Sequence, residues 1–291
     1  MGNSVIDLPV QPIDFHTHLG EVRSFHPKIK GWIKAELNDL LQYMNETSIS
    51  KVVVHSLPPR SDPFSRVVSN TRLLRITRKI RDKVVPFCCP SPKGKNIQAT
   101  LRRFLEEGCK GLGELKTRSR VDDTRILALL KTAEDLGIPA LIHVEEGPIF
   151  SYCYGVESLA EVLEKFPSLK LIVHGPGWWK HISDDSGVEA YPSGPVRGEG
   201  LVQRLLRRFD NLYVDISAAS GLNALSRDLE HARRFLEEFQ DKVLYGTDFP
   251  CLSSSGQFGI DRSHINLLLN LGLGTRVLRK ILRENAERVL R

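Results

Sequence analysis

Short, β-branched apolar runs alternate with longer amphipathic stretches along most of the chain. This alternation is typical of repeated βα units, in which each buried strand is followed by a helix. The apolar runs predict eight strands, at Ile13–Leu19, Lys51–Leu57, Val84–Cys89, Gly111–Lys116, Ala140–Glu145, Leu169–Gly175, Leu212–Ser217 and Val243–Thr247. The amphipathic stretches predict helices at Leu37–Thr47, Ser65–Arg81, Ile97–Glu107, Thr124–Leu136, Val156–Phe166, Leu201–Arg208, Ala224–Phe239 and Arg262–Leu271, with one or two more in Thr275–Leu290.

Eight strands that are each followed by a helix are compatible with an open doubly wound sheet or with a closed barrel. The open sheet favours a glycine-rich phosphate loop after an early strand, but strand one is followed by the sequence His-Thr-His-Leu-Gly. A closed barrel collects its chemistry from the carboxyl ends of many strands, which is where the polar residues of this chain occur. We therefore predict an α/β fold, a (β/α)₈ TIM barrel, with residues 1–291 forming a single domain.

Composition limits the cellular compartment and the partners that we expect for this protein. No apolar run approaches the roughly 20 residues that cross a bilayer, and no secretory signal is evident, so we expect a cytoplasmic protein without a membrane partner. The five cysteines include no C-x-x-C pair, which indicates buried thiols in a reducing compartment rather than disulfides or a thiolate metal site. The net charge of +6 comes from helix-borne arginine pairs set among acids, so nucleic acid is disfavoured as a partner. The oligomeric state is left open, a homo-oligomer included.

The end of strand one carries the first candidate for chemistry. Because side chains alternate along a strand, His16 and His18 should share the face that looks into the barrel mouth. The same alternation predicts that Phe15 and Thr17 point to the surrounding helices. Two imidazoles that project together form a natural half-site for Zn²⁺ or a similar ion, although two histidines on a wet strand end also occur by chance.

Four later strands offer residues of the same kind at the same end. Strand four supplies Glu114, strand five His143, strand six His174, and strand eight ends in Asp248. Any one of these side chains could be a hydrogen-bonded structural residue. Together with the pair on strand one they predict a site for a divalent metal at the barrel mouth, with Zn²⁺ favoured and one or two ions bound.

The chain resembles the amidohydrolase superfamily, in the amidohydrolase-related group that includes aminocarboxymuconate-semialdehyde decarboxylase. The resemblance spans most of the chain, through the segments IDFHTH, GLGELK, LIHVEE, LIVHGPG, LYGTDFP and LRENAERVL. It implies that His16, His18, His143 and Asp248 bind metal. It also implies that His174 binds a second ion or acts as a catalytic acid or base.

Strand four departs from one pattern of the superfamily, a carboxylated lysine that bridges two metals. Here Glu114 is better placed to bridge, which is similar to TatD-like metal-dependent hydrolases, whose strand-four motif also contains Gly-Glu. Lys116 lies on the same predicted face, so a carboxylated Lys116 stays open as an alternative. The decarboxylase-like relatives use one metal, and Glu114 therefore favours a two-metal hydrolytic site.

Weaker candidates for contact with substrate surround this group. His55 ends strand two and either faces the pocket or is a structural histidine. Lys116 and Arg118 leave strand four with positive charge that could clamp a substrate carboxylate or phosphate, or could simply be solvated. Trp178 begins the long polar connection after strand six, where it either lines a binding loop or packs beneath it as a small satellite core.

The interpretation that follows is a metal-dependent hydrolase that uses metal-activated water on a small-molecule amide, lactone or ester. In this hypothesis Asp248 takes the proton from the water, and His174 or the metal stabilises the developing oxyanion. The alternative with the same ligands is non-oxidative decarboxylation of an aromatic or unsaturated acid. A metal-dependent nuclease and a barrel that only binds a ligand are further alternatives, disfavoured by the absence of a basic stripe and by the full ligand set.

Overall fold

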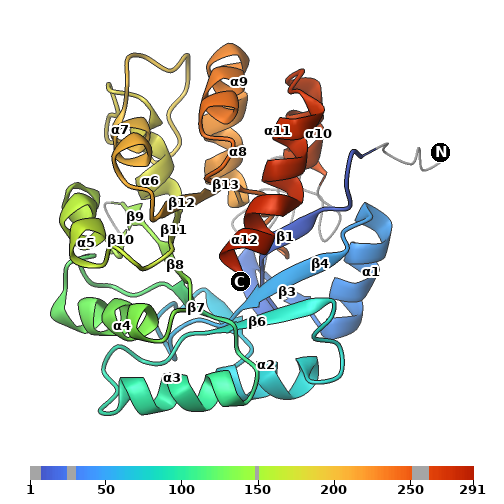
Figure 1. Cartoon of the computed structure of the whole chain (residues 1–291), viewed down its shortest axis with the longest axis vertical. Helices are drawn as coiled ribbons and strands as arrows, with labels where there is room; N and C mark the ends of the chain where they lie inside the picture. The colour runs from blue at the N-terminus through green and yellow to red at the C-terminus, as the bar shows by residue number, and fades with distance from the viewer. Residues whose placement is uncertain (1–7, 25–30, 148–150, 251–261) are drawn as a thin grey trace.

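In the computed structural model, eight parallel strands form a ring with helices around it (Figure 1). The structure describes residues 8–24, 31–147, 151–250 and 262–291. Around the ring the strands are β1 Ile13–Thr17, β4 Lys51–His55, β6 Val84–Cys88, β7 Gly111–Leu115, β8 Ala140–His143, β11 Leu171–His174, β12 Leu212–Asp215 and β13 Val243–Leu244. Neighbours in this order pair in parallel, so the predicted (β/α)₈ barrel is confirmed.

The helices follow the strands in the predicted order. They are α1 Leu37–Thr47, α2 Asn70–Thr77, α3 Ile97–Glu106, α4 Thr124–Asp135, α5 Leu159–Lys165, α6 Pro176–Trp179, α7 Leu201–Arg208, α8 Ala218–Ser226, α9 Leu229–Glu238, α10 Ser263–Asn270, α11 Thr275–Arg279 and α12 Asn285–Val289. None of the helices in the described part of the chain has the length and apolarity needed to span a membrane.

The ring closes between β1 and the segment that follows β13. The backbone N–H of Phe15 donates to the carbonyl of Tyr245, that of Asp248 to His16, and that of His18 to Phe249. The carboxylate of Asp14 reinforces this closure. It accepts from the N–H of Thr247 at 3.1 Å and from the hydroxyl of Thr247 at 2.6 Å.

Asp14 also joins the closure to α1, because the hydroxyl of Tyr43 donates to the second oxygen of Asp14 at 2.8 Å. Burial raises the pKa of Asp14 to about 6, against the lowering effect of its hydrogen bonds with Thr247, His16 and Tyr43. A buried carboxylate is tolerated only when its oxygens are paired, and here both are. The first strand, the last strand and the first helix therefore meet at one fully bonded group.

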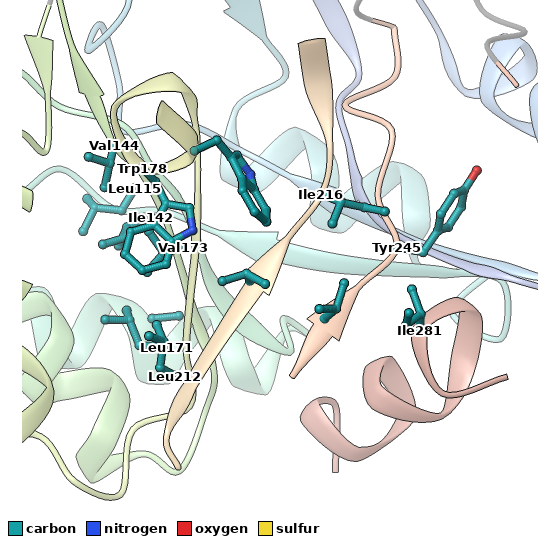
Figure 2. Close-up of a cluster of buried hydrophobic side chains, with 14 of the residues drawn as sticks. Leu115, Ile142, Val144, Leu171, Val173, Trp178, Leu212, Ile216, Tyr245 and Ile281 are labelled. Atoms are coloured by element: carbon teal, nitrogen blue, oxygen red, sulfur yellow. The ribbon is translucent and has the colours of Figure 1, made fainter. Parts of the chain in front are cut away.

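Two apolar layers hold the barrel. The inner layer fills the ring with one or two side chains from each strand except β7, such as Phe15, Phe87 and Tyr213. The helix α12 covers its amino-terminal end with Ala286 and Val289. The outer layer packs the strands against the helices. Figure 2 shows part of it, with labelled side chains Leu115, Ile142, Val144, Leu171, Val173, Trp178, Leu212, Ile216, Tyr245 and Ile281.

The prediction that Phe15 points to the helices is wrong. β1 contains a bulge, since Asp14 pairs with Val52 while Thr17 pairs with Val54, so that three residues of β1 oppose two of β4. The extra residue breaks the strict alternation of side chains. Phe15 belongs to the inner layer, with its ring centroid 5.7 Å from that of Phe87, and the next residue, His16, also lies in the barrel.

Two predicted helices have different bounds for local reasons. The stretch predicted as one helix from residue 65 begins with a strand, β5 Ser65–Val67, and α2 starts only after Ser69, whose side chain accepts from the N–H of Arg72. The stretch 224–239 contains two helices, because Asp228 has extended backbone angles and caps α9 by accepting from His231 N–H. In both cases an N-cap residue inside the predicted range marks the true start.

Two small antiparallel sheets were not predicted. One consists of β2 Gly20–Ser24, β3 Gly31–Ala35 and β5, and the other of β9 Glu145–Glu146 and β10 Ser151–Tyr152. β2 begins three residues after β1 and β9 two residues after β8, so both sheets stand at the carboxyl ends of barrel strands. They add walls to the end of the barrel where polar residues collect.

The predicted buried thiols are confirmed where the structure describes them. Cys88, Cys89, Cys109 and Cys153 are buried and free, and Cys251 lies outside the described residues.

The closure at Asp14 generates a stability prediction. Tyr43→Phe removes a buried donor to an ionised carboxylate, so above the pKa of Asp14 it should lower the free energy of unfolding by about 1.5–3 kcal/mol. Tyr213→Phe is the matched control, because Tyr213 is also a buried tyrosine and its hydroxyl bonds none of the described residues. Urea unfolding of the two variants measures the difference, and equal stability would show that this bond does not hold the closure.

Candidate metal centre and active site

The carboxyl ends of six barrel strands, and the turn after β13, bring a dense group of polar side chains into the mouth. The group contains His16 and His18 from β1, Glu114 from β7, His143 from β8, His174 from β11, Asp215 from β12 and Asp248 after β13, with His55 of β4 beside it. All of these side chains except those of His143 and Asp248 are less than a tenth exposed. The six metal-ligand candidates of the sequence therefore lie together.

The first part of this group is built around the two histidines of strand one. Their Nε2 atoms lie 3.1 Å apart. The Oδ1 atom of Asp248 is 3.7 Å from His16 Nε2 and 3.3 Å from His18 Nε2. The Oε2 atom of Glu114 is 3.8 Å and 3.2 Å from the same nitrogens. Two nitrogens and two carboxylate oxygens thus surround one small space.

The contacts of the two Nδ1 atoms determine which tautomer His16 and His18 adopt. His16 Nδ1 lies 2.6 Å from Oδ2 of Asp215, and His18 Nδ1 lies 2.9 Å from the carbonyl oxygen of His55. Both partners are acceptors, so both Nδ1 atoms donate. In the neutral imidazoles the lone pairs of the two Nε2 atoms therefore face each other at short range. Such an arrangement needs a cation between them, a proton or a metal ion.

The second part of the group lies on the other side of Glu114. Its Oε1 atom is 2.9 Å from Nδ1 of His143 and 2.8 Å from Nε2 of His174. These two ring nitrogens are themselves 3.2 Å apart. One oxygen of Glu114 thus faces the histidines of strand one, and the other faces those of strands five and six.

The pKa values follow from this crowding. Burial lowers the pKa of His18, but hydrogen bonds with Asp248 and Glu114 outweigh it and raise the value to about 9. Burial raises the pKa of Glu114, but its bonds with four histidines hold it well below the usual range. Burial and the nearby charge on His16 lower the pKa of His174 to about 4.

The donor set fits a divalent ion. The acids are ionised, Glu114 and Asp215 are buried, and the imidazole nitrogens converge on the same small space. Neutral imidazole nitrogen and carboxylate oxygen are the ligands of Zn²⁺ and related ions, and Asp215 supplies the carboxylate behind a ligating histidine that such sites commonly use.

The weaker candidates have different surroundings. His55 is fully buried beside His16, with ring centroids 4.8 Å apart, and its Nε2 atom lies 2.9 Å from the carbonyl oxygen of Phe15. Lys116 forms an ion pair with Asp62 at 2.9 Å and lies 4.9 Å from the centre of the Tyr152 ring. Arg118 also lies over that ring, at 5.9 Å. These cations therefore border the mouth on the side of β7 and β10.

The structure does not bring Trp178 to the mouth. Its side chain is fully buried within the large outer layer, among residues such as Ile142 and Val173 (Figure 2). Of the two roles considered from the sequence, packing is the one that its position fits, although in the main core rather than in a satellite.

Three residues beside the ligands were missed from the sequence. Asp215 ends β12 as Asp248 follows β13, so the rule that identified the other candidates could have found it. Glu145 places Oε2 3.3 Å from His143 Nε2. Ser217 places its hydroxyl between His16 and His174, at 3.2 Å and 3.4 Å from their Nδ1 atoms. A serine and a second glutamate carry no motif, so only the fold reveals them.

Comparison with known proteins decides the family. The model of a family described as amidohydrolase matches residues 13–291. The chain belongs to the amidohydrolase family. The resemblance drawn from the sequence is confirmed, and the matched residues include every strand of the barrel. No curated protein matches the sequence of this amidohydrolase.

Solved structures share the fold of this amidohydrolase. A probable 2-pyrone-4,6-dicarboxylic acid hydrolase from Acinetobacter baumannii is 13% identical with a TM-score of 0.66, and the match covers 97% of this chain and 99% of that one. An uncharacterised TIM-barrel protein from Bordetella bronchiseptica is 21% identical with a TM-score of 0.67, covering 97% and 98%. A 2,6-dihydroxybenzoate decarboxylase from Rhizobium is 14% identical with a TM-score of 0.63, covering 96% and 98%.

The convergence of ionised acids on these imidazoles predicts stabilisation by a cation. An ion that binds only the folded protein adds about 2.7 kcal/mol at 100 times its Kd, which should raise the unfolding midpoint of chelator-treated protein by about 5–10 °C. Zn²⁺, Mn²⁺ and Co²⁺ are added separately, and thermal unfolding is recorded.

In His18→Ala the added ion should raise the unfolding midpoint much less, because the variant removes one of the two facing nitrogens. His231→Ala is the control, since His231 lies on α9 and bonds Gln203 instead of the mouth group. A gain that persists in His18→Ala would place the cation elsewhere.

Proposed function

We propose that this amidohydrolase is a hydrolase with a centre for two divalent ions, acting on a small organic acid that carries a lactone, ester or amide bond. The observation that carries the proposal is the position of Glu114 between two sets of ring nitrogens. One oxygen is 3.2 Å from His18 Nε2, and the other is 2.8 Å from His174 Nε2. A carboxylate shared in this way is suited to holding two cations close together.

The residues divide into two sets of ligands in this proposal. His16, His18, Asp248 and one oxygen of Glu114 would hold the first ion. The other oxygen of Glu114, with His174 and His143, would hold the second. Zn²⁺ is the ion we favour, because both sets consist of imidazole nitrogen and carboxylate oxygen. Such ions polarise a substrate oxygen and make water a stronger nucleophile near neutral pH.

Asp248 is the proposed general base. Its side chain is 15% exposed, compared with 4% for Glu114 and none for Asp215, so it is the carboxylate of the group most open to water and substrate. Its N–H donates to the carbonyl of His16, which fixes the backbone where the side chain enters the mouth. A carboxylate held there can accept the proton that the attacking water loses.

His174 was assigned a ligand role and a catalytic role from the sequence. Its low pKa, about 4, favours the ligand role, because a neutral imidazole offers a lone pair and is a poor proton donor near neutral pH. Stabilisation of the developing oxyanion is then left to the cations that His174 helps to hold.

An acidic substrate is supported by the charges at the rim. Lys116 and Arg118 leave β7 beside Glu114, and both lie over the ring of Tyr152. The Lys116 ammonium is held in place by an ion pair with Asp62 that offsets its charge, so a substrate carboxylate would depend more on the Arg118 guanidinium beside it. The names of the structural neighbours point the same way, since one is a dicarboxylic acid hydrolase with citric acid bound and another acts on dihydroxybenzoate.

Decarboxylation of an aromatic or unsaturated acid is the second candidate. The names of two neighbours favour it, a 2,6-dihydroxybenzoate decarboxylase and a 5-carboxyvanillate decarboxylase. This reaction needs only the ion held by the first set of ligands, so the pairing of Glu114 with His143 and His174 favours hydrolysis.

The role of Glu114 predicts a change in metal stoichiometry. Glu114→Gln loses the charge shared between the two sets of ligands, so the zinc content should fall from about two ions per chain to about one. Elemental analysis after dialysis against buffered Zn²⁺ measures it. Glu146→Gln is the control, because Glu146 accepts from the N–H groups of Gly155 and Val156 and contacts none of the proposed ligands. Two ions retained in Glu114→Gln would contradict the bridging role.

Incorporation of labelled solvent atoms into the product distinguishes hydrolysis from decarboxylation. Lactones, esters and amides of small dicarboxylic acids, together with hydroxylated aromatic acids, are incubated with the enzyme in ¹⁸O-labelled water and analysed by mass spectrometry. We expect one labelled oxygen in the product and no CO₂. Release of CO₂, with deuterium from deuterated water on the carbon that lost it, would instead establish the decarboxylase.

On a substrate found in this way, Asp248→Asn should lower turnover by about 10²–10⁴-fold, since the amide cannot accept a proton. Asp62→Asn is a matched control at the rim, expected to act mainly on KM through Lys116. A smaller loss of turnover in Asp248→Asn than in Asp62→Asn would mean that another group is the base.

A further inference from the structure

Ser217 occupies an unusual position between the two sets of ligands. It is the N-cap residue of α8, yet its side chain makes no capping hydrogen bond. Its fully buried hydroxyl points toward the mouth instead, where it donates to Oδ2 of Asp215 at 2.8 Å. The same oxygen lies 3.4 Å from Nδ1 of His174. A serine that gives up a stabilising helix cap is expected to serve another purpose.

The protons in this chain of contacts can be counted. His16 Nδ1 lies 2.6 Å from Asp215 Oδ2 and donates to it, because a carboxylate only accepts. The single hydroxyl proton of Ser217 also goes to Asp215 Oδ2. The Ser217 oxygen then has only lone pairs to offer to His174. It can accept a hydrogen bond from Nδ1–H of His174, but it cannot donate one to Nδ1.

The location of the His174 proton decides whether this histidine can hold a cation. A neutral imidazole carries one proton, on Nδ1 or on Nε2. The Nε2 atom faces Glu114 at 2.8 Å, so a proton there would bond the carboxylate and block the lone pair. A proton on Nδ1 frees that lone pair. Among the described residues, the Ser217 hydroxyl is the side-chain group that the structure places within reach of Nδ1.

We propose that Ser217 is a positioning residue that selects the Nδ1-protonated form of His174 and so prepares the second set of ligands for its ion. The proposal rests on the two-ion centre proposed above. Asp215 then serves both sets, through His16 directly and through the Ser217 hydroxyl to His174. One buried carboxylate at the end of β12 thus orients one histidine in each set.

The test compares Ser217→Ala with the wild type and with Ser220→Ala. Ser220 is also buried in α8, and its hydroxyl has no partner among the described residues, so its loss is a matched control. Competition with a chromophoric chelator measures the affinity for the first and the second Zn²⁺. Ser217→Ala should bind the second ion about 10–100-fold more weakly, as expected for the loss of a partner behind a metal ligand. Ser220→Ala should bind both ions as the wild type does.

Spectra of ¹⁵N-histidine-labelled protein give a second readout that does not depend on the measured affinities or on activity. In the zinc-loaded wild type we expect the proton of His174 on Nδ1, and in Ser217→Ala we expect it to shift toward Nε2. Ser217→Thr, which keeps a hydroxyl, should show the wild-type spectrum and affinity. Ser217→Gly, which also lacks the hydroxyl and is accepted at an N-cap position, replaces the alanine variant if that variant does not fold.

The outcomes separate the two proposals. A wild type that binds fewer than two ions contradicts the two-ion centre, and the position of the His174 proton then tests the role of Ser217 by itself. Equal affinity for the second ion in Ser217→Ala and the wild type, or a His174 proton on Nε2 in both, would overturn the role proposed for Ser217.

Discussion

The meeting of the first and last strands is the constraint on which the structure depends. β13 pairs with β12 over only two residues. Beyond β13 the ring is completed by backbone hydrogen bonds in both directions. The N–H groups of Phe15 and His18 donate to the segment after β13, and the N–H of Asp248 donates back to His16. Asp14 accepts four further bonds at the same place, including one from α1. Because these bonds run through the residues next to the ligands, the closure of the barrel and the geometry of the mouth are fixed together.

The bulge in β1 extends this coupling into the site. A regular strand would place Phe15 and His16 on opposite faces, and one of them would leave the barrel. The bulge turns both inward, so that Phe15 fills the inner layer below the mouth while His16 reaches Asp215 across the ring. The apolar floor and the polar mouth are thus built from adjacent residues. The histidines then stand on a rigid layer, which is what a site with distances of about 3 Å requires.

Much of this architecture was predictable because it depends on periodicity. All eight strands were predicted within a few residues, since fully buried parallel strands appear as apolar runs, and the strand ends then indicated His16, Glu114 and His174. What failed was local. The hydrophobic pattern of Ser65–Val67 is compatible with a helix, and only pairing with β2 makes it a strand. Trp178 looked like a loop residue because the short helix α6 that buries it has no signature of its own.

Ser217 could not be identified from the sequence, for a different reason. It contacts His174 and His16, which lie 43 and 201 residues away from it in the chain. No spacing rule links residues at such separations, and a serine after a strand is more often a helix cap. Its position beside the ligands is visible only once the ring has placed β12 between β11 and β13.

The order of the ligands along the chain has a consequence for biosynthesis. His16 and His18 leave the ribosome first, whereas Asp248, which shares their space, is added more than 200 residues later. Throughout elongation the early histidines therefore lack both their carboxylate and the strand that seals the ring. Glu114, His143 and His174 join the chain before Asp248, but the first set of ligands proposed above stays incomplete until the last turn of the barrel arrives. Tight binding of a cation by that set would therefore come only at the end of folding.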